Sequence, residues 1–102
     1  MICGNAFVLK PAEDVPLCAV SFVRCLAEAG FPPGVFNLVH GPGEPTGAVL
    51  VDHAAVDLIS FMGSSDGDRG VGAICAGRHA NVSLEMGGKN VRVVLDDVDR
   101  PW

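Results

Sequence analysis

The sequence contains no run of basic residues and no long apolar run. Seven basic against twelve acidic residues give a formal net charge of −5, so no surface is expected to neutralise nucleic-acid phosphates. No apolar stretch approaches the roughly 18 residues that span a bilayer, and the start MICGNAF lacks the order of a signal peptide. We expect a cytoplasmic protein with no nucleic-acid partner and no membrane partner.

Patterns typical of metal and disulfide sites are also missing. The four cysteines are too scattered for C-x-x-C and too few for a disulfide scaffold, and we interpret them as buried reduced thiols. The three histidines lack the spacing of metal ligands. The segment GSSDGDRG contains neither a Walker motif nor G-x-G-x-x-G, so by itself it is weak evidence for a phosphate loop. The sequence predicts no metal site.

Apolar residues make up 49% of the 102 residues, which is typical of one globular domain or a piece of a larger one. Short runs containing β-branched residues predict strands at 6–10, 35–40, 56–61, 81–85 and 91–95. Helical spacing predicts helices at 16–29, at 45–53 with Thr46 as its cap, and at about 66–76, where Gly70 and Gly72 weaken the prediction. Alternation of strands and helices indicates an α/β fold with a parallel sheet built from βαβ units.

Residues suited to binding a ligand follow each of the first four predicted strands. In an open parallel sheet, ligands bind beyond the carboxyl ends of the strands. The residues at these ends are Lys10 and Glu13; Gly41, Pro42 and Gly43; Gly63 and Ser64; Glu85, Gly87 and Gly88. The alternative for each is simple: the charged pair lies in solvent, and glycine after a strand forms a turn or a close backbone approach.

Glu85 is the least ordinary of these residues. Glutamate is rarely buried without a partner, and the flanking VSL and Met86 predict a position near the core. A carboxylate in an apolar wall is suited to accepting a proton near neutral pH, and Gly87 and Gly88 leave room for a ligand. We therefore take Glu85 as a candidate general base.

Four blocks of sequence resemble, in order and spacing, the aldehyde dehydrogenase superfamily. They are LKPAED-x-P at 9–16, AGFPPGVFNLVHGPG at 29–43, ISFMGS at 59–64 and SLEMGGKN at 83–90, so the resemblance covers essentially the whole chain. It implies a Rossmann-like fold that is an incomplete fragment of the larger enzyme fold. Residues 1–82 would be part of the NAD-binding domain, and residues 83–102 the glutamate motif and the start of the catalytic domain.

The resemblance implies where the cofactor binds. Lys10 and Glu13 match residues that hold the adenosine ribose, and the carboxylate would repel a 2′-phosphate, which favours NAD over NADP. The other matches are Gly43 beside the adenine, Phe61, Gly63 and Ser64 at the pyrophosphate, and the backbone of Met86 near the nicotinamide.

The resemblance also implies a reaction, the oxidation of a small-molecule aldehyde to a carboxylic acid through a cysteine thioester. Glu85 matches the general base that activates water to hydrolyse the thioester. The nucleophilic cysteine of the family lies downstream, beyond Trp102, so the chain is expected to be inactive alone. Members of the family are usually homo-oligomeric.

Three departures and two alternatives accompany this interpretation. Met62 stands where the family usually has threonine, Asp68 where it has glycine, and Val15 where a threonine caps the first helix. Asp68 would repel a pyrophosphate, and Val15 should weaken the helix start by about 1 kcal/mol. The alternatives are a non-catalytic nucleotide-binding module and an interaction fragment that pairs with a full-length subunit through open sheet edges.

Overall fold

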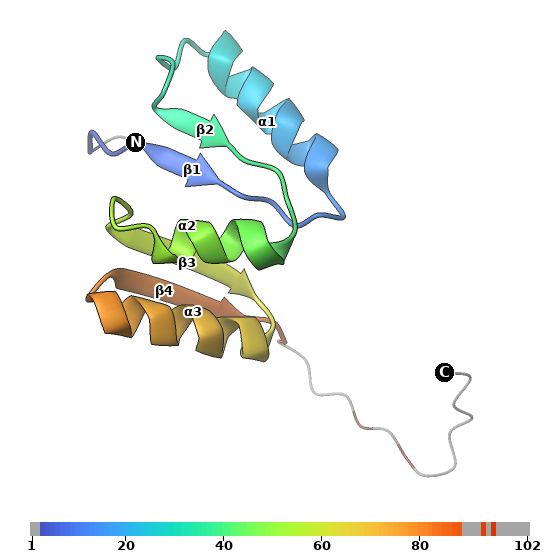
Figure 1. Cartoon of the computed structure of the whole chain (residues 1–102). Helices are drawn as coiled ribbons and strands as arrows, with labels where there is room; N and C mark the ends of the chain where they lie inside the picture. The colour runs from blue at the N-terminus through green and yellow to red at the C-terminus, as the bar shows by residue number, and fades with distance from the viewer. Residues whose placement is uncertain (1–2, 89–92, 94, 96–102) are drawn as a thin grey trace. The chain divides into compact units, whose positions relative to one another are not determined.

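The computed structural model describes residues 3–88, 93 and 95, and its chain forms two compact units (Figure 1). The first unit ends at Asp57 and the second begins at Leu58. The elements in chain order are β1 (Phe7–Leu9), α1 (Pro16–Glu28), β2 (Phe36–Leu38), the π-helical turn η1 (Gly43–Gly47), α2 (Ala48–Asp52), β3 (Leu58–Gly63), α3 (Ser65–Arg78) and β4 (Asn81–Met86).

The first unit is a βαβ arrangement in which α1 connects two parallel strands. β1 pairs with β2 in a register that places Phe7 opposite Phe36, and α1 packs against β2. The rings of Phe7 and Phe36 stack with centroids 5.2 Å apart, and the ring of Phe22 meets Phe36 edge-on at 5.6 Å. These three rings from three elements form an aromatic cluster on one face of the strand pair.

The ends of α1 follow the sequence closely. Pro16 occupies the first helical position, where its missing N–H removes no helical hydrogen bond. Val15 precedes it without a side-chain cap, as its apolar side chain requires. At the other end, Gly30 takes a φ of +82°, which glycine adopts readily and which stops the helix.

The segment between β2 and α2 corrects one prediction. Thr46 does not cap a helix, because η1 runs directly into α2 and only Glu44 within η1 departs from helical backbone angles. The side chain of Thr46 instead packs against Gly41, where an added Cβ would lie 2.8 Å from the Thr46 Cβ. The predicted close backbone approach after β2 is therefore present at Gly41.

The second unit repeats the βαβ pattern with longer elements. β3 and β4 are parallel over six residue pairs, from Leu58 opposite Asn81 to Gly63 opposite Met86. α3 connects them and packs on both strands. The predicted α/β class with parallel strands is confirmed, and the strands form two parallel pairs, β1 with β2 and β3 with β4. Most of the strand predicted at 91–95 lies outside the described residues.

The helix α3 is longer than predicted and begins with a side-chain cap. The Oγ of Ser64 accepts a hydrogen bond from the Gly67 N–H at 3.2 Å. Gly72, which weakened the prediction, lies close to β4, since a Cβ there would be 3.5 Å from Leu84 Cδ1. The glycine thus allows close packing of helix on strand, which offsets its low helix propensity.

The cysteines correct a second prediction. Only Cys75, on the face of α3 that packs on the strands, is fully buried, whereas Cys3, Cys18 and Cys25 are exposed. Cys18 and Cys25 belong to α1, which contacts a pair of short strands, so only part of its surface is covered. None of the helices in the described part of the chain is long and apolar enough to cross a membrane.

Candidate functional site

Lys10 and Glu13 form the first part of a candidate site in the first unit. Lys10 directly follows β1, and its Nζ lies 3.3 Å from Oε2 of Glu13. The lysine side chain is only 15% exposed, whereas that of Glu13 is 61% exposed. The methylene groups of Lys10 are therefore covered, whereas the Glu13 carboxylate is open to solvent. The carboxylate can accept hydrogen bonds from a ligand while it is paired with the lysine ammonium.

The loop after β2 contributes two glycines to the same place. The backbone of Gly43 lies close enough to Glu13 to lower the pKa of its carboxyl. Gly47 lies against the lysine stem, since a Cβ there would be 4.0 Å from Lys10 Cδ. We call Lys10, Glu13, Gly43 and Gly47 the Lys10–Glu13 cluster. The predicted convergence of residues that follow β1 and β2 is present, and Gly47 is a member that the sequence analysis missed, because it was assigned simply to the helix at 45–53.

The cluster favours the charged form of Glu13. The pKa of Glu13 lies below its ordinary value of 4.5, first because a backbone N–H of Glu13 itself stabilises the carboxylate. The hydrogen bond and positive charge of Lys10 lower the pKa further, and Gly43 adds to the effect. At neutral pH the cluster therefore offers carboxylate oxygens, which accept hydrogen bonds from hydroxyl groups.

The turn after β3 holds the second group of predicted residues. The ring of Phe61 lies under this turn, because a Cβ at Gly63 would be 2.7 Å from the ring Cζ and a Cβ at Gly67 would be 2.9 Å from it. Both positions therefore need glycine while the ring stays in place. Ser64 caps α3 next to the ring, so Phe61, Gly63 and Ser64 lie together at this turn.

Asp68 lies in the first turn of the same helix. It is only 7% exposed, and its Oδ1 is buried with no hydrogen-bond partner among the residues that the structure describes. The turn after β3 and the Lys10–Glu13 cluster belong to different units of the chain.

Glu85 corrects a third prediction, because it is exposed rather than near the core. Alternation along β4 turns Leu84 toward α3, so Glu85 points to the opposite face of the strand pair, beside Met62 in the parallel register. No helix of the second unit covers this face in the described residues. Met86, one position on, is also exposed.

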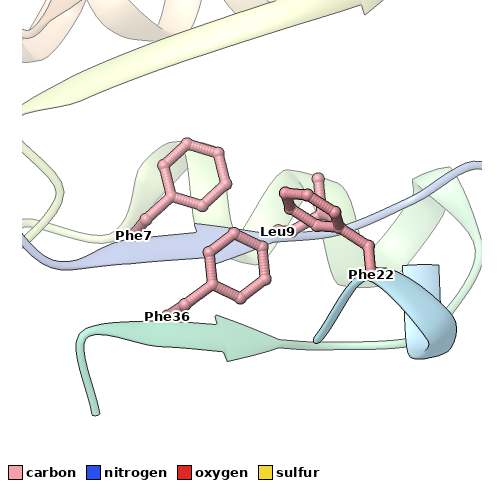
Figure 2. A pocket seen from close by; sticks show the side chains of 4 residues that line it. All are labelled: Phe7, Leu9, Phe22 and Phe36. Atoms are coloured by element: carbon pink, nitrogen blue, oxygen red, sulfur yellow. The ribbon is translucent and has the colours of Figure 1, made fainter. Parts of the chain in front are cut away.

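An apolar pocket lies in the first unit, and none of the predicted cofactor residues lines it (Figure 2). It has a volume of about 280 Å³ and is lined by Phe7, Leu9, Phe22 and Phe36. None of these side chains can donate or accept a hydrogen bond, so the pocket cannot orient a nucleotide. Among residues 3–88, 93 and 95, no three His, Cys, Asp or Glu side chains gather closely enough to hold a metal ion.

Comparison with known proteins identifies relatives along nearly the whole chain. A betaine aldehyde dehydrogenase from Rhizobium johnstonii and a phenylacetaldehyde dehydrogenase from Pseudomonas fluorescens are each 44% identical over 99 residues, covering 97% of this chain and 20% of the relative. The chain thus spans about a fifth of the length of the curated relatives that it matches.

Solved structures agree with these sequence matches. An aldehyde dehydrogenase from Bartonella henselae superimposes with a TM-score of 0.80 at 38% identity, covering 92% of this chain and 20% of that one. The NAD+ complex of an aldehyde dehydrogenase from Bacillus cereus gives a TM-score of 0.80 at 39% identity, over 92% of this chain and 19% of that one. The aldehyde dehydrogenase family model matches residues 1–101, and the chain therefore belongs to the aldehyde dehydrogenase family.

Proposed function

We propose that the chain supplies cofactor-binding residues of an NAD-dependent aldehyde dehydrogenase, which oxidises an aldehyde to a carboxylic acid through a cysteine thioester. The Lys10–Glu13 cluster carries this proposal, because it joins a covered lysine, an open carboxylate and a backbone donor after two parallel strands. Support comes also from a relative whose solved structure contains NAD+. When bound, NAD would accept a hydride from the substrate.

In this proposal each charged group of the cluster contacts the adenosine ribose. The Glu13 carboxylate accepts hydrogen bonds from the ribose hydroxyls, and the Lys10 ammonium donates to one of them. A 2′-phosphate would meet the negative charge of Glu13, so NAD is preferred over NADP. Residues 1–82 would then belong to the NAD-binding domain, and residues 83–102 would begin the catalytic domain.

Glu85 has the proposed role of general base for thioester hydrolysis. Its exposed position, on the side of β4 away from α3, leaves the carboxylate accessible to a water molecule. A carboxylate within hydrogen-bond reach of that water can take its proton as the water attacks the acyl group. The backbone at Met86 would lie near the nicotinamide, and Phe61, Gly63 and Ser64 near the pyrophosphate.

Titration calorimetry with adenosine tests the ribose site directly. Glu13→Ala should weaken adenosine binding by about 10- to 100-fold, because the ribose hydroxyls would lose their charge-assisted hydrogen bonds to the carboxylate. Asp14→Ala is the matched control, since it removes a neighbouring exposed carboxylate that has no assigned contact with the ligand. Equal affinities for the parent, Glu13→Ala and Asp14→Ala, with folding checked by circular dichroism, would refute the role of Glu13.

The pH dependence of adenosine binding follows from the lowered pKa of Glu13. The affinity should stay constant from neutral pH down to 4.5, the ordinary pKa of glutamate, and fall only at more acidic pH, where Glu13 becomes protonated. Calorimetry across this range gives the profile. Glu13→Gln, which has no titrating carboxyl, should bind adenosine with an affinity that does not change over the same acid range. An affinity that already falls well above 4.5 would mean that Glu13 is not the group that binds the ribose.

A further inference from the structure

The two ends of α3 are held in different ways. At the amino end, the Oγ of Ser64 accepts a hydrogen bond from the Gly67 N–H at 3.2 Å, and the Asp68 N–H donates to the Ser64 carbonyl oxygen at 2.9 Å. At the carboxyl end, the helix stops at His79, whose φ of +57° lies in the left-handed region. A residue with a Cβ adopts this region at a cost that glycine avoids. The amino end is therefore capped by a side chain, whereas the carboxyl end is strained.

Glycine is frequent within the same helix. Four of its 14 residues are glycine, namely Gly67, Gly70, Gly72 and Gly77. Gly67 and Gly72 lie against side chains of β3 and β4, which explains why they carry no side chain. An added Cβ at Gly70 or Gly77 would meet nothing within 4 Å, so packing does not require glycine at either position. Relative to alanine, each of these two glycines shifts the helix toward its open form by about fivefold.

The carboxyl-terminal half of α3, residues 70–78, buries few side chains. Val71 and Cys75 are its buried residues, with exposed fractions of 8% and 0%. The carbonyl oxygen of Cys75 also accepts a hydrogen bond from the Ala80 N–H at 3.0 Å, which closes the end of the helix. Helices in proteins are stabilised mainly by packing of an apolar face, and here two side chains of moderate size provide it. This half thus combines low helix propensity, a strained end and a small buried face.

We propose that the carboxyl-terminal half of α3 is a segment that opens while the amino-terminal turn of the helix and the first unit stay folded. Opening breaks the hydrogen bond that closes the helix at Ala80 and exposes the thiol of Cys75 to solvent. Segments of low local stability open in this way, as contiguous units and without global unfolding. The inference concerns the second unit alone and is independent of the proposed cofactor site.

Labelling of Cys75 with a disulfide reagent tests the proposal in the full chain. The exposed Cys3, Cys18 and Cys25 are replaced by serine, so that only Cys75 can react. Urea is raised within the range where circular dichroism shows a folded chain. Local opening exposes little surface, so the labelling rate should change by less than about twofold per molar urea, whereas global unfolding would raise it at least about fivefold. The steeper dependence, or labelling as fast as in the unfolded chain, would overturn the proposal.

Four further variants identify the segment that opens. Gly70→Ala and Gly77→Ala should each slow the labelling by about fivefold, because alanine favours the closed helix. Ala76→Gly, at an exposed position of α3, should speed it by about fivefold. Ala27→Gly is the matched control, since it makes the same change at an exposed position near the end of α1 and should leave the rate within about twofold. Equal acceleration by the two alanine replacements would mean that Cys75 reacts through unfolding of the whole chain, and the proposal would be wrong.

Amide hydrogen exchange measured by NMR locates the boundary of the opening segment. After correction for intrinsic rates, the Ala80 N–H, bonded to the Cys75 carbonyl oxygen, should exchange at least about fivefold faster than the Asp68 N–H, bonded to that of Ser64. Gly70→Ala should slow exchange at Ala80 and leave that at Asp68 unchanged. Equal protection of the two amides would overturn the proposal. This comparison uses only the parent and a helix-stabilising variant, so it decides the question even if Ala76→Gly fails to fold.

Discussion

Gly41→Ala is expected to lower the free energy of unfolding by about 3 kcal/mol. The methyl group would lie 2.8 Å from the Cβ of Thr46 and 3.0 Å from its Cγ2, so a rotation of the threonine side chain cannot relieve the clash with Cβ. The backbone adds strain, because Gly41 has a φ of +156°, which residues with a side chain rarely adopt. Urea denaturation followed by circular dichroism measures the loss.

Gly43→Ala is the matched control for this prediction. It lies two residues away with no heavy atom within 4 Å of the added methyl group, so its stability should stay within about 0.5 kcal/mol of the parent. Thr46→Gly combined with Gly41→Ala should recover part of the loss, since it removes the atoms that the new methyl group meets. If Gly41→Ala were as stable as the parent, the packing of Thr46 on Gly41 would not contribute to the fold.

The elements with strong local signals could be predicted from the sequence. Pro16 and Gly30 bracket α1 because proline fixes a helical φ and glycine adopts a positive one, and both effects act within a single residue. Short β-branched runs located the strands for the same reason. Which strands pair, and which helix face is covered, depends on contacts distant in sequence, so neither followed from local pattern alone.

Burial was the least predictable property. Glu85 was expected near the core because its neighbours are apolar, yet strand alternation and the single helix on β4 leave it exposed. Three of the four cysteines are exposed for a related reason, since small hydrophobic residues are buried only where another element covers them. Local composition indicates which residues can be buried, and the number of packed layers decides which of them are.

The part of the candidate site that directly follows a strand could be predicted from the sequence. Lys10 and Glu13 follow a strand at a spacing that allows an ion pair, and the structure forms it. Gly47 was not predicted as part of the site. It lies against the side chain of Lys10, and a contact between residues this far apart in sequence has no local sequence signal. The resemblance marks Asp68 as a departure from the family pattern, and the structure adds that it is buried, with no hydrogen-bond partner for its Oδ1 among the described residues.

No NADH should form when these 102 residues are incubated with NAD and an aldehyde. Oxidation through a thioester needs a thiolate that attacks the aldehyde beside the nicotinamide. Cys75 is fully buried. Cys3, Cys18 and Cys25 precede the glutamate motif, whereas the resemblance implies a nucleophile that follows it. Loss of a nucleophile typically lowers the rate by at least about 10⁴-fold, so NADH absorbance should match a blank without protein.

Betaine aldehyde and phenylacetaldehyde are suitable substrates for this assay, because relatives of the chain are named for them. The same preparation should bind adenosine. Adenosine binding would show that the absence of NADH is due to the missing nucleophile and not to an unfolded chain. Aldehyde-dependent NADH would contradict the prediction, and serine variants of Cys3, Cys18 and Cys25 would then show which thiol had reacted. A silent chain that binds adenosine would support nucleotide recognition at the Lys10–Glu13 cluster and would show that these 102 residues do not oxidise the aldehyde by themselves.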